Sequence, residues 1–283
     1  IKGAFSVANP NWNYSNKTIV ASIESSVTDR MADYGYETGK TGFSFGSAWE
    51  QYDDVVFNPK FSLFYEKLDT NQSATSNLKK QEGEYFDTSF SYGFDLDKRN
   101  QRFQTSEGFQ SRFIQRIPII SESDTLLNGY TFDTYHSYND VTASLGLYLK
   151  AVTGLSDDVR ISERVNIPRK RLRGFEAGRV GPVDANDHVG GNYAASLNFQ
   201  TNLPFLFSSF QSVDLNYFID AGNVWGVDYS NSVGDSSHIR SSTGLAANWF
   251  TPIGPLSFSF AHPITKASTD KTEGFRFNLG TSF

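Results

Sequence analysis

The sequence predicts an all-β fold, a transmembrane antiparallel β-barrel, on three observations. Apolar and polar residues alternate with a period of two in one segment after another. Aromatic residues make up 15% of the 283 residues, with 25 Phe and 14 Tyr. No apolar run approaches the roughly 20 residues that a membrane helix needs, whereas strands of about 10 residues suit a tilted membrane span.

The alternating pattern marks about thirteen segments. In chain order they cover residues 2–8, 17–27, 38–48, 55–66, 84–95, 107–118, 129–137, 140–150, 191–201, 212–221, 239–250, 255–262 and 274–283. Short links near 49–54, 137–140, 203–211 and 251–255 alternate with longer polar links at 29–37, 67–83, 151–189, 225–238 and 263–273. A link of middling length at 97–106 interrupts this regularity slightly. Alternation of short turns and long loops is typical of outer-membrane barrels, and we expect one barrel domain over 1–283.

The two faces of each segment differ in chemistry. In segment 85–95 the even positions are mostly aromatic and the odd positions are small or acidic. A soluble sandwich would bury the aromatic face in a core, but the opposite faces are unusually polar and small, which favours a wet barrel lumen. We therefore expect the following residues to face lipid: Phe86, Phe90, Phe94, Leu145, Leu147, Leu215, Tyr217, Phe258 and Phe260. We expect a second set to face the lumen: Ser89, Gly93, Asn198, Asp214 and Asp220.

Composition excludes several function classes. The formal net charge is -6, and no basic patch indicates a nucleic-acid partner. The absence of Cys rules out disulfides and thiolate metal sites, and the four His residues lack metal-ligand spacing. Residues 42–46 match the G-x-S-x-G pattern of a nucleophile elbow, but alternating Phe43 and Phe45 put them inside a strand. We expect no enzyme activity, cofactor, metal site or small-molecule substrate.

The longest link, 151–189, carries an unusual cluster of cations. Arg169, Lys170, Arg171 and Arg173 place four positive charges in five positions. A loop of this length is usually functional or disordered. One interpretation is a solvated external loop. If instead the loop folds into the lumen, Arg173 needs a carboxylate partner, because an unpaired guanidinium away from water is costly. The strand phase offers Asp220 and Asp214 on the polar face.

Several motifs resemble the BamA family of outer-membrane protein assembly factors, in a form similar to that of alphaproteobacteria. The segments that carry the resemblance are the loop motif at 172–175, the G-G-N at 190–192, the segments 218–225 and 249–256, and the last strand at 275–283. A weaker similarity reaches back to about Gly3, and residues 9–12 resemble a periplasmic turn. The motifs occur in the family's order and spacing over about 110 residues.

The resemblance implies a sixteen-stranded barrel preceded by periplasmic POTRA domains, of which this chain would hold the fourth to sixteenth strands. It implies that loop 151–189 is extracellular and folds into the lumen. It implies no enzyme activity and no cofactor, but the folding and insertion of β-barrel proteins into the bacterial outer membrane. The implied partners are outer-membrane lipids, unfolded β-barrel clients and the accessory lipoproteins of an assembly complex.

The resemblance also implies which residues matter. Arg173, Gly174 and Phe175 match the loop motif, and Asp220 matches an acid of the barrel wall. Asn198 stands where the family has a second acid and brings no charge, which leaves the second partner of Arg173 open. As a secondary lumen contact, its amide oxygen accepts a hydrogen bond.

The final strand implies a weakly paired seam that templates a client strand. Phe275, Phe277, Leu279 and Phe283 form its apolar face, and Gly280 matches a glycine where the strand bends, so we expect pairing to weaken from Gly280 onward. Three alternatives stay open. A related secretion transporter would share the loop motif, a porin-like channel would have an open lumen, and a barrel enzyme would need a clustered Ser/His/Asp set.

Overall fold

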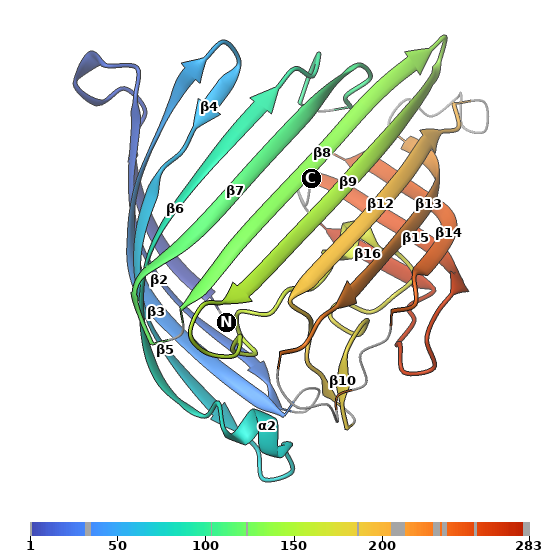
Figure 1. Cartoon of the computed structure of the whole chain (residues 1–283). Helices are drawn as coiled ribbons and strands as arrows, with labels where there is room; N and C mark the ends of the chain where they lie inside the picture. Colours follow the sequence, from blue (N-terminus) through green and yellow to red (C-terminus); the bar gives the residue numbers. More distant parts are fainter. Residues whose placement is uncertain are drawn as a thin grey trace.

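The computed structural model describes the chain except residues 1, 32–34, 103, 123, 186, 205–212, 229–232, 234–236, 252–253 and 280–283. One antiparallel sheet dominates it (Figure 1). Its strands are β1 (Lys2–Asn9), β2 (Thr18–Arg30), β3 (Tyr36–Tyr52), β4 (Val55–Phe57), β5 (Lys60–Thr70), β6 (Gly83–Asp97), β7 (Gly108–Ser121), β8 (Thr125–Tyr138), β9 (Val141–Gly154), β12 (Tyr193–Asn202), β13 (Val213–Trp225), β14 (Arg240–Thr251), β15 (Gly254–Thr265) and β16 (Phe275–Leu279).

The 14 strands occupy thirteen positions in the sheet, because β4 and β5 share the place between β3 and β6. The all-β prediction and the predicted number of segments are therefore confirmed. Segment 55–66 is broken at Asn58 and Pro59, since proline has no N–H to donate to a ladder. Several strands are longer than expected: β3 spans Tyr36–Tyr52, β8 begins at Thr125, and β9 runs to Gly154.

The remaining elements are short. A β-hairpin of β10 (Val183–Asp184) and β11 (Asp187–His188) and the 3₁₀ turn η2 (Arg169–Arg171) lie in the connection between β9 and β12. Helix α2 (Ser76–Lys79) follows β5, and η1 (Trp12–Tyr14) follows β1. Among the described residues, no helix has the length and apolar character needed to cross a membrane.

The two faces of the sheet differ as the alternation predicts. Several expected lipid-facing side chains are exposed on the outer face, with exposed fractions of 40% for Phe86, 37% for Phe90 and 43% for Leu145. Phe94 and Phe260 are exposed as well, and Leu147, Leu215, Tyr217 and Phe258 are half-buried. On the concave face Gly93, Asn198 and Asp220 are buried, and Ser89 and Asp214 are half-buried. Residues 42–46, with Ser44 buried, lie inside β3.

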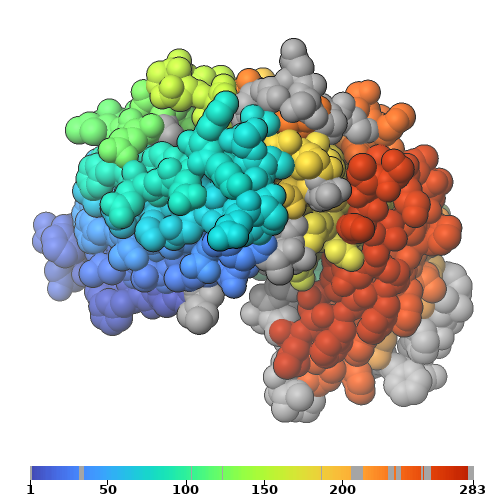
Figure 2. Space-filling model, turned by 90° about the horizontal axis from the view of Figure 1, so that it is seen from below, coloured from blue at the N-terminus to red at the C-terminus, as the bar shows by residue number. Residues whose placement is uncertain are grey.

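The core of the molecule lies between the sheet and the long connection 155–192. In Figure 2 this segment, in yellow, lies between the early strands in blue to cyan and the last strands in red. One buried cluster joins the connection to β9, β12 and β13: Val152, Val159, Val165, Ile167, Leu172, Phe175, Val180, Ala194 and Val224. A second cluster joins it to β3, β5 and α2: Tyr36, Leu68, Ala74, Leu78, Ile161 and Val189. The connection therefore packs on the concave face of the sheet.

Candidate functional site

The loop motif turns sharply at Gly174. Its φ angle is +87°, in the left-handed region that side chains other than glycine rarely adopt. A Cβ atom at this position would lie 3.2 Å from the Cβ atoms of both Ser242 and Ala261. The Ser242 hydroxyl donates a hydrogen bond to the carbonyl of Arg173. Glycine thus lets the loop backbone approach the inner faces of β14 and β15.

The Arg173 side chain meets Asp220 on β13. Its Nε donates to Asp220 Oδ2 at 2.7 Å, and its Nη2 donates to Oδ1 at 2.8 Å, which is a bidentate pair. The backbone N–H of Arg173 donates to the same carboxylate at 3.0 Å. The guanidinium lies 3.6 Å from the centre of the Phe218 ring, a cation–π contact. Asp220 has no exposed surface, so the pair is shut off from solvent on the acid side.

Two residues of β12 complete this arrangement. Asn198 donates through Nδ2 to Asp220 Oδ1 at 2.9 Å and to the Arg171 carbonyl at 2.7 Å. It therefore supports the acid rather than providing a second partner for Arg173. That second partner is Gln200, whose Oε1 accepts from Arg173 Nη1 at 2.8 Å. Gln200 was not predicted from the sequence, although it lies two residues after Asn198 on the same face of a strand.

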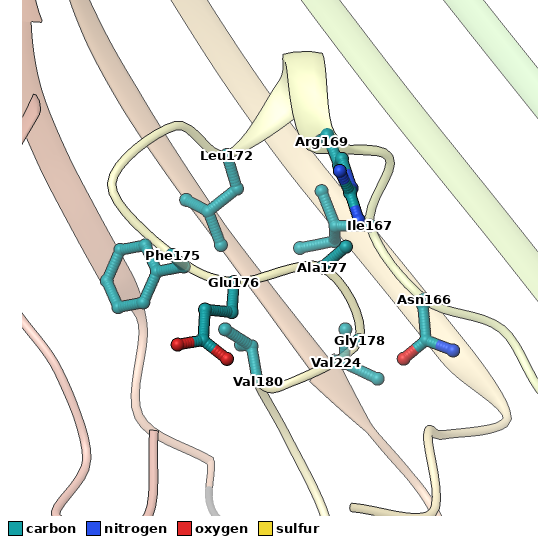
Figure 3. Close-up of a pocket in the computed structure, with 10 residues that line it drawn as sticks. All are labelled: Asn166, Ile167, Arg169, Leu172, Phe175, Glu176, Ala177, Gly178, Val180 and Val224. Carbon is teal, nitrogen blue, oxygen red and sulfur yellow. The ribbon is translucent and has the colours of Figure 1, made fainter. Parts of the chain in front are cut away.

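The apolar part of the motif packs beneath the ion pair. Phe175 is 2% exposed, and Leu172 is 4% exposed. Figure 3 shows both lining a small cavity together with Ile167, Val180 and Val224. The cavity holds about 10 Å³, which is room for no more than about one water molecule. It is a packing gap rather than a ligand site.

A second arginine of the cation cluster is also paired. Arg171 donates to both oxygens of Asp133 on β8 at 2.7 Å. Arg169 and Lys170, in contrast, are exposed. The cluster thus divides into two arginines that bind the wall and two cations that face solvent. The contact with Asp133 was not predicted, because nothing in the loop motif specifies which strand lies opposite Arg171.

The first part of the connection binds the opposite wall through a charge network. Three carboxylates, Glu66, Asp87 and Glu163, offer oxygen atoms within 4.8 Å of one another, a spacing that would suit a metal ion. Each has a cationic partner instead. Arg160 Nη2 lies 3.1 Å from Glu66 and 2.6 Å from Asp87. Glu163 pairs with Lys40 at 3.4 Å and with Arg116. With their charges matched in this way, the acids form a salt-bridge network that fastens the loop to β3, β5, β6 and β7.

The ends of the connection are held by Asp228, in the link after β13. Its carboxylate accepts from the Val159 N–H at 2.8 Å and from Asn192 Nδ2 at 3.1 Å, and it pairs with Arg164. Burial alone would raise the pKa of Asp228, but these donors outweigh it and leave the pKa below its ordinary value. Asp228 therefore ties the start and the end of the connection together.

His188, on the hairpin of the connection, is buried, with 4% of its surface exposed. The Thr269 backbone and the charged side chains of Arg179 and Asp270 lie near it. Burial, followed by the nearby Arg179, lowers its pKa to about 4. His188 therefore stays neutral at ordinary pH.

The terminal strand is described as far as Leu279. Its outward side chains Phe275, Phe277 and Leu279 are 50%, 49% and 67% exposed. Two of them pack against aromatic rings of β15 in tilted pairs, with ring centroids 5.1 Å apart for Phe277 and Phe258 and 4.9 Å apart for Phe275 and Phe260. Gly280 and Phe283 lie outside the described residues, so the expected weakening there stays a prediction.

Curated relatives resemble the chain over 40% to 88% of its length. It is 25% identical over 256 residues to the outer membrane protein assembly factor BamA of Neorickettsia risticii, a match that covers 88% of this chain. It is 30% identical over 139 residues to BamA of Neisseria meningitidis, covering 40% of this chain. It is also 25% identical over 221 residues to the sorting assembly machinery 50 kDa subunit of Saccharomyces cerevisiae, covering 74% of this chain. The chain spans only 34%, 17% and 46% of these three relatives. Their names describe assembly factors rather than enzymes, in agreement with the expected lack of enzyme activity.

Solved structures share the fold. The crystal structure of BamA from Haemophilus ducreyi lacking POTRA domains 1–3 superposes with a TM-score of 0.86 at 22% identity, covering 98% of this chain and 61% of that one. CdiB from Acinetobacter baumannii gives a TM-score of 0.57 at 11% identity, covering 98% of this chain and 56% of that one. The model of the Omp85 superfamily domain matches residues 2–283. Both the predicted barrel fold and the predicted family resemblance are therefore confirmed, and the chain belongs to the Omp85 superfamily.

Proposed function

We propose that the chain is the barrel part of a BamA-type insertase, which folds β-barrel proteins and inserts them into the bacterial outer membrane. The observation that carries the proposal is the bidentate contact between Arg173 and Asp220, which holds the loop motif on the concave face of the sheet. The relatives named as assembly factors support the same activity. In this proposal the loop 151–189 is extracellular and folds into the lumen.

The loop acts as an internal brace. It contacts β13 through Arg173, β8 through Arg171 and β5 through Arg160. A loop fixed to several strands at once stiffens the wall and fills the lumen. This speaks against a porin-like channel, which needs an open path for solutes.

The working part is the seam at β16. Backbone groups on an unpaired strand edge bind an extended segment by strand addition, so the last strand is suited to template a client strand. The outward side chains Phe275, Phe277 and Leu279 give this edge an apolar face toward outer-membrane lipids. A short apolar belt near the seam would also thin the bilayer and lower the insertion barrier. The partners are unfolded β-barrel clients and the accessory lipoproteins of an assembly complex.

The test uses the full-length protein in lipid vesicles together with an unfolded reporter barrel. We expect the protein to accelerate reporter folding, measured by heat-modifiable gel mobility, and to rescue cells depleted of their native factor. Planar-bilayer conductance is recorded on the same preparation. Steady large conductance without accelerated folding would contradict the proposal and favour a channel.

A further inference from the structure

The inner face of β16 carries a buried cation that the proposed function does not use. Arg276 is 8% exposed and lies between the outward-facing Phe275 and Phe277. Its Nη1 donates to the Arg169 carbonyl at 2.9 Å, and its Nη2 donates to the Phe175 carbonyl at 2.8 Å. The terminal strand thus binds the loop backbone at Arg169, just before the loop motif, and at Phe175, the last residue of the motif.

The chemistry of these contacts requires arginine. The guanidinium also donates through Nε to Glu273 Oε2 at 2.9 Å, so a carboxylate balances its charge. Two backbone carbonyls accept hydrogen bonds from its Nη1 and Nη2. A planar fork with fixed donors reaches three acceptors at once, whereas a lysine ammonium is a point charge on a flexible stem. A lysine at 276 would keep the charge but lose the simultaneous contacts.

The backbone next to Arg276 makes a second attachment to the same loop segment. The Glu273 N–H donates to the Gly174 carbonyl, and the Glu176 N–H donates to the Lys271 carbonyl, both at 3.0 Å. Phe175 and Thr272 form an antiparallel bridge between these two bonds. Residues 174–176 and 271–273 therefore pair like two short strands immediately before β16.

We propose that Arg276 is a positioning residue that joins the terminal strand to the loop motif, so that β16 and residues 169–176 loosen together. In the described structure β16 is paired with β15 over only five residue pairs, from Leu256–Leu279 to Phe260–Phe275. The loop is its other attachment. The inference deepens the proposed function, on which it rests, because release of this strand is the templating step. With this coupling, the loop restrains the release of β16 from the sheet as well as stabilising the barrel wall.

Hydrogen exchange on the purified full-length protein in detergent tests this coupling. For Arg276→Gln we expect the amides of β16 and of 169–176 to exchange at least about tenfold faster, since hydrogen bonds to a charged donor are lost. Arg276→Lys should recover only part of the protection. Asn278→Ala is the matched control, because Asn278 shares the inner face of β16 and has no side-chain hydrogen bond in the described residues. Faster exchange in β16 alone, or in neither segment, would overturn the inference.

A cross-link provides a test that does not depend on the stability of an Arg276 variant. The chain has no Cys, so the pair Glu176→Cys and Lys271→Cys is a clean reporter at exposed, adjacent positions. Oxidised, this pair should slow exchange in both segments of the otherwise unchanged protein and should restore protection to Arg276→Gln. Reduction should abolish both effects. If oxidation protects 169–176 but leaves β16 unchanged, the two segments are not coupled.

The hydrogen-exchange and cross-linking measurements do not depend on whether the protein folds client barrels. Failure of the wild-type protein to fold a reporter barrel would contradict the proposed function and leave the exchange result standing. Conversely, uncoupled exchange in a protein that folds the reporter would contradict only the role of Arg276.

Discussion

Arg173 and Asp220 lie 47 residues apart in the sequence but form an ion pair. The Asp220 side chain in this pair has no solvent-exposed surface. Four donors converge on its two oxygens: Nε, Nη2 and the backbone N–H of Arg173, and Nδ2 of Asn198. An enclosed carboxylate with all of its donors in place is stable only as long as the loop stays where it is. The pair therefore couples the position of the loop to the integrity of β13.

Replacing Arg173 with Ala should destabilise the barrel strongly. The variant leaves Asp220 buried without its counter-charge, which costs about 3–5 kcal/mol for a buried pair. Asp220→Asn should be milder, because the amide keeps one acceptor oxygen. The measurements are heat-modifiable gel mobility and complementation of cells depleted of the native factor.

The control for this prediction is the pair of Arg112 and Asp95. Their atoms lie 2.8 Å apart, but the Arg112 side chain is 55% exposed. Arg112→Ala should behave like wild type, because exposed ion pairs contribute little. Equal behaviour of Arg173→Ala and Arg112→Ala would show that burial of Asp220 is unimportant.

Period-two alternation was sufficient to locate the strands, because every residue of a barrel wall faces either lipid or the interior. It could not locate the break at Pro59, which depends on the neighbouring strands: the Pro59 carbonyl accepts from Ser47, and the Asn58 N–H donates to Gly93. Helix α2 was missed as well. Its Leu78 is buried in a cluster that includes the loop residues Ile161 and Val189, which lie far away in the sequence.

The site was predicted only in part for the same reason. Strand phase put Asp220 on the inner face, and the family resemblance pointed to Arg173. The partners of Arg171, Arg160 and Arg276 are set by how a connection of nearly forty residues crosses the sheet, and no local pattern encodes that path. Long-range ion pairs of this kind require the three-dimensional structure.

The pair of Arg240 and Asp270 should be a second point of high sensitivity. Neither side chain has any exposed surface, and the guanidinium donates to the two carboxylate oxygens at 2.9 Å and 3.0 Å. Asp270→Ala leaves a buried guanidinium without its acid, so we expect a loss of about 3–5 kcal/mol. Urea unfolding in detergent micelles, followed by gel mobility, measures it. The exposed pair of Lys67 and Asp69 is the control, and Asp69→Ala should not move the urea midpoint.

Mild acid should loosen the connection through His188. Its pKa is about 4 in the folded protein against an ordinary value of 6.5, so the unfolded chain binds the additional proton between these values. Stability therefore falls as the pH drops from about 6.5 to about 4, by up to about 3 kcal/mol from this group. Hydrogen exchange of residues 179–191 across this pH range should show the loss. His188→Gln should flatten the profile.

Substitutions on the outer face should depend on depth in the bilayer. Leu145 is 43% exposed, faces outward as the fifth of the 14 residues of β9 and pairs with Phe199 and Thr134. An arginine there must enter hydrocarbon, so Leu145→Arg should cost about 2–4 kcal/mol of folding free energy in lipid vesicles. Tyr138 is 77% exposed at the end of β8, beside a tight turn, where an arginine side chain reaches water. Tyr138→Arg should therefore cost no more than about 1 kcal/mol.

Urea titration of the full-length protein in vesicles gives the folding free energy of both variants. In detergent, which adapts to a charged side chain, the difference between the two variants should shrink. If Leu145→Arg folded into vesicles as well as Tyr138→Arg, the outer face of β9 would not be in contact with lipid.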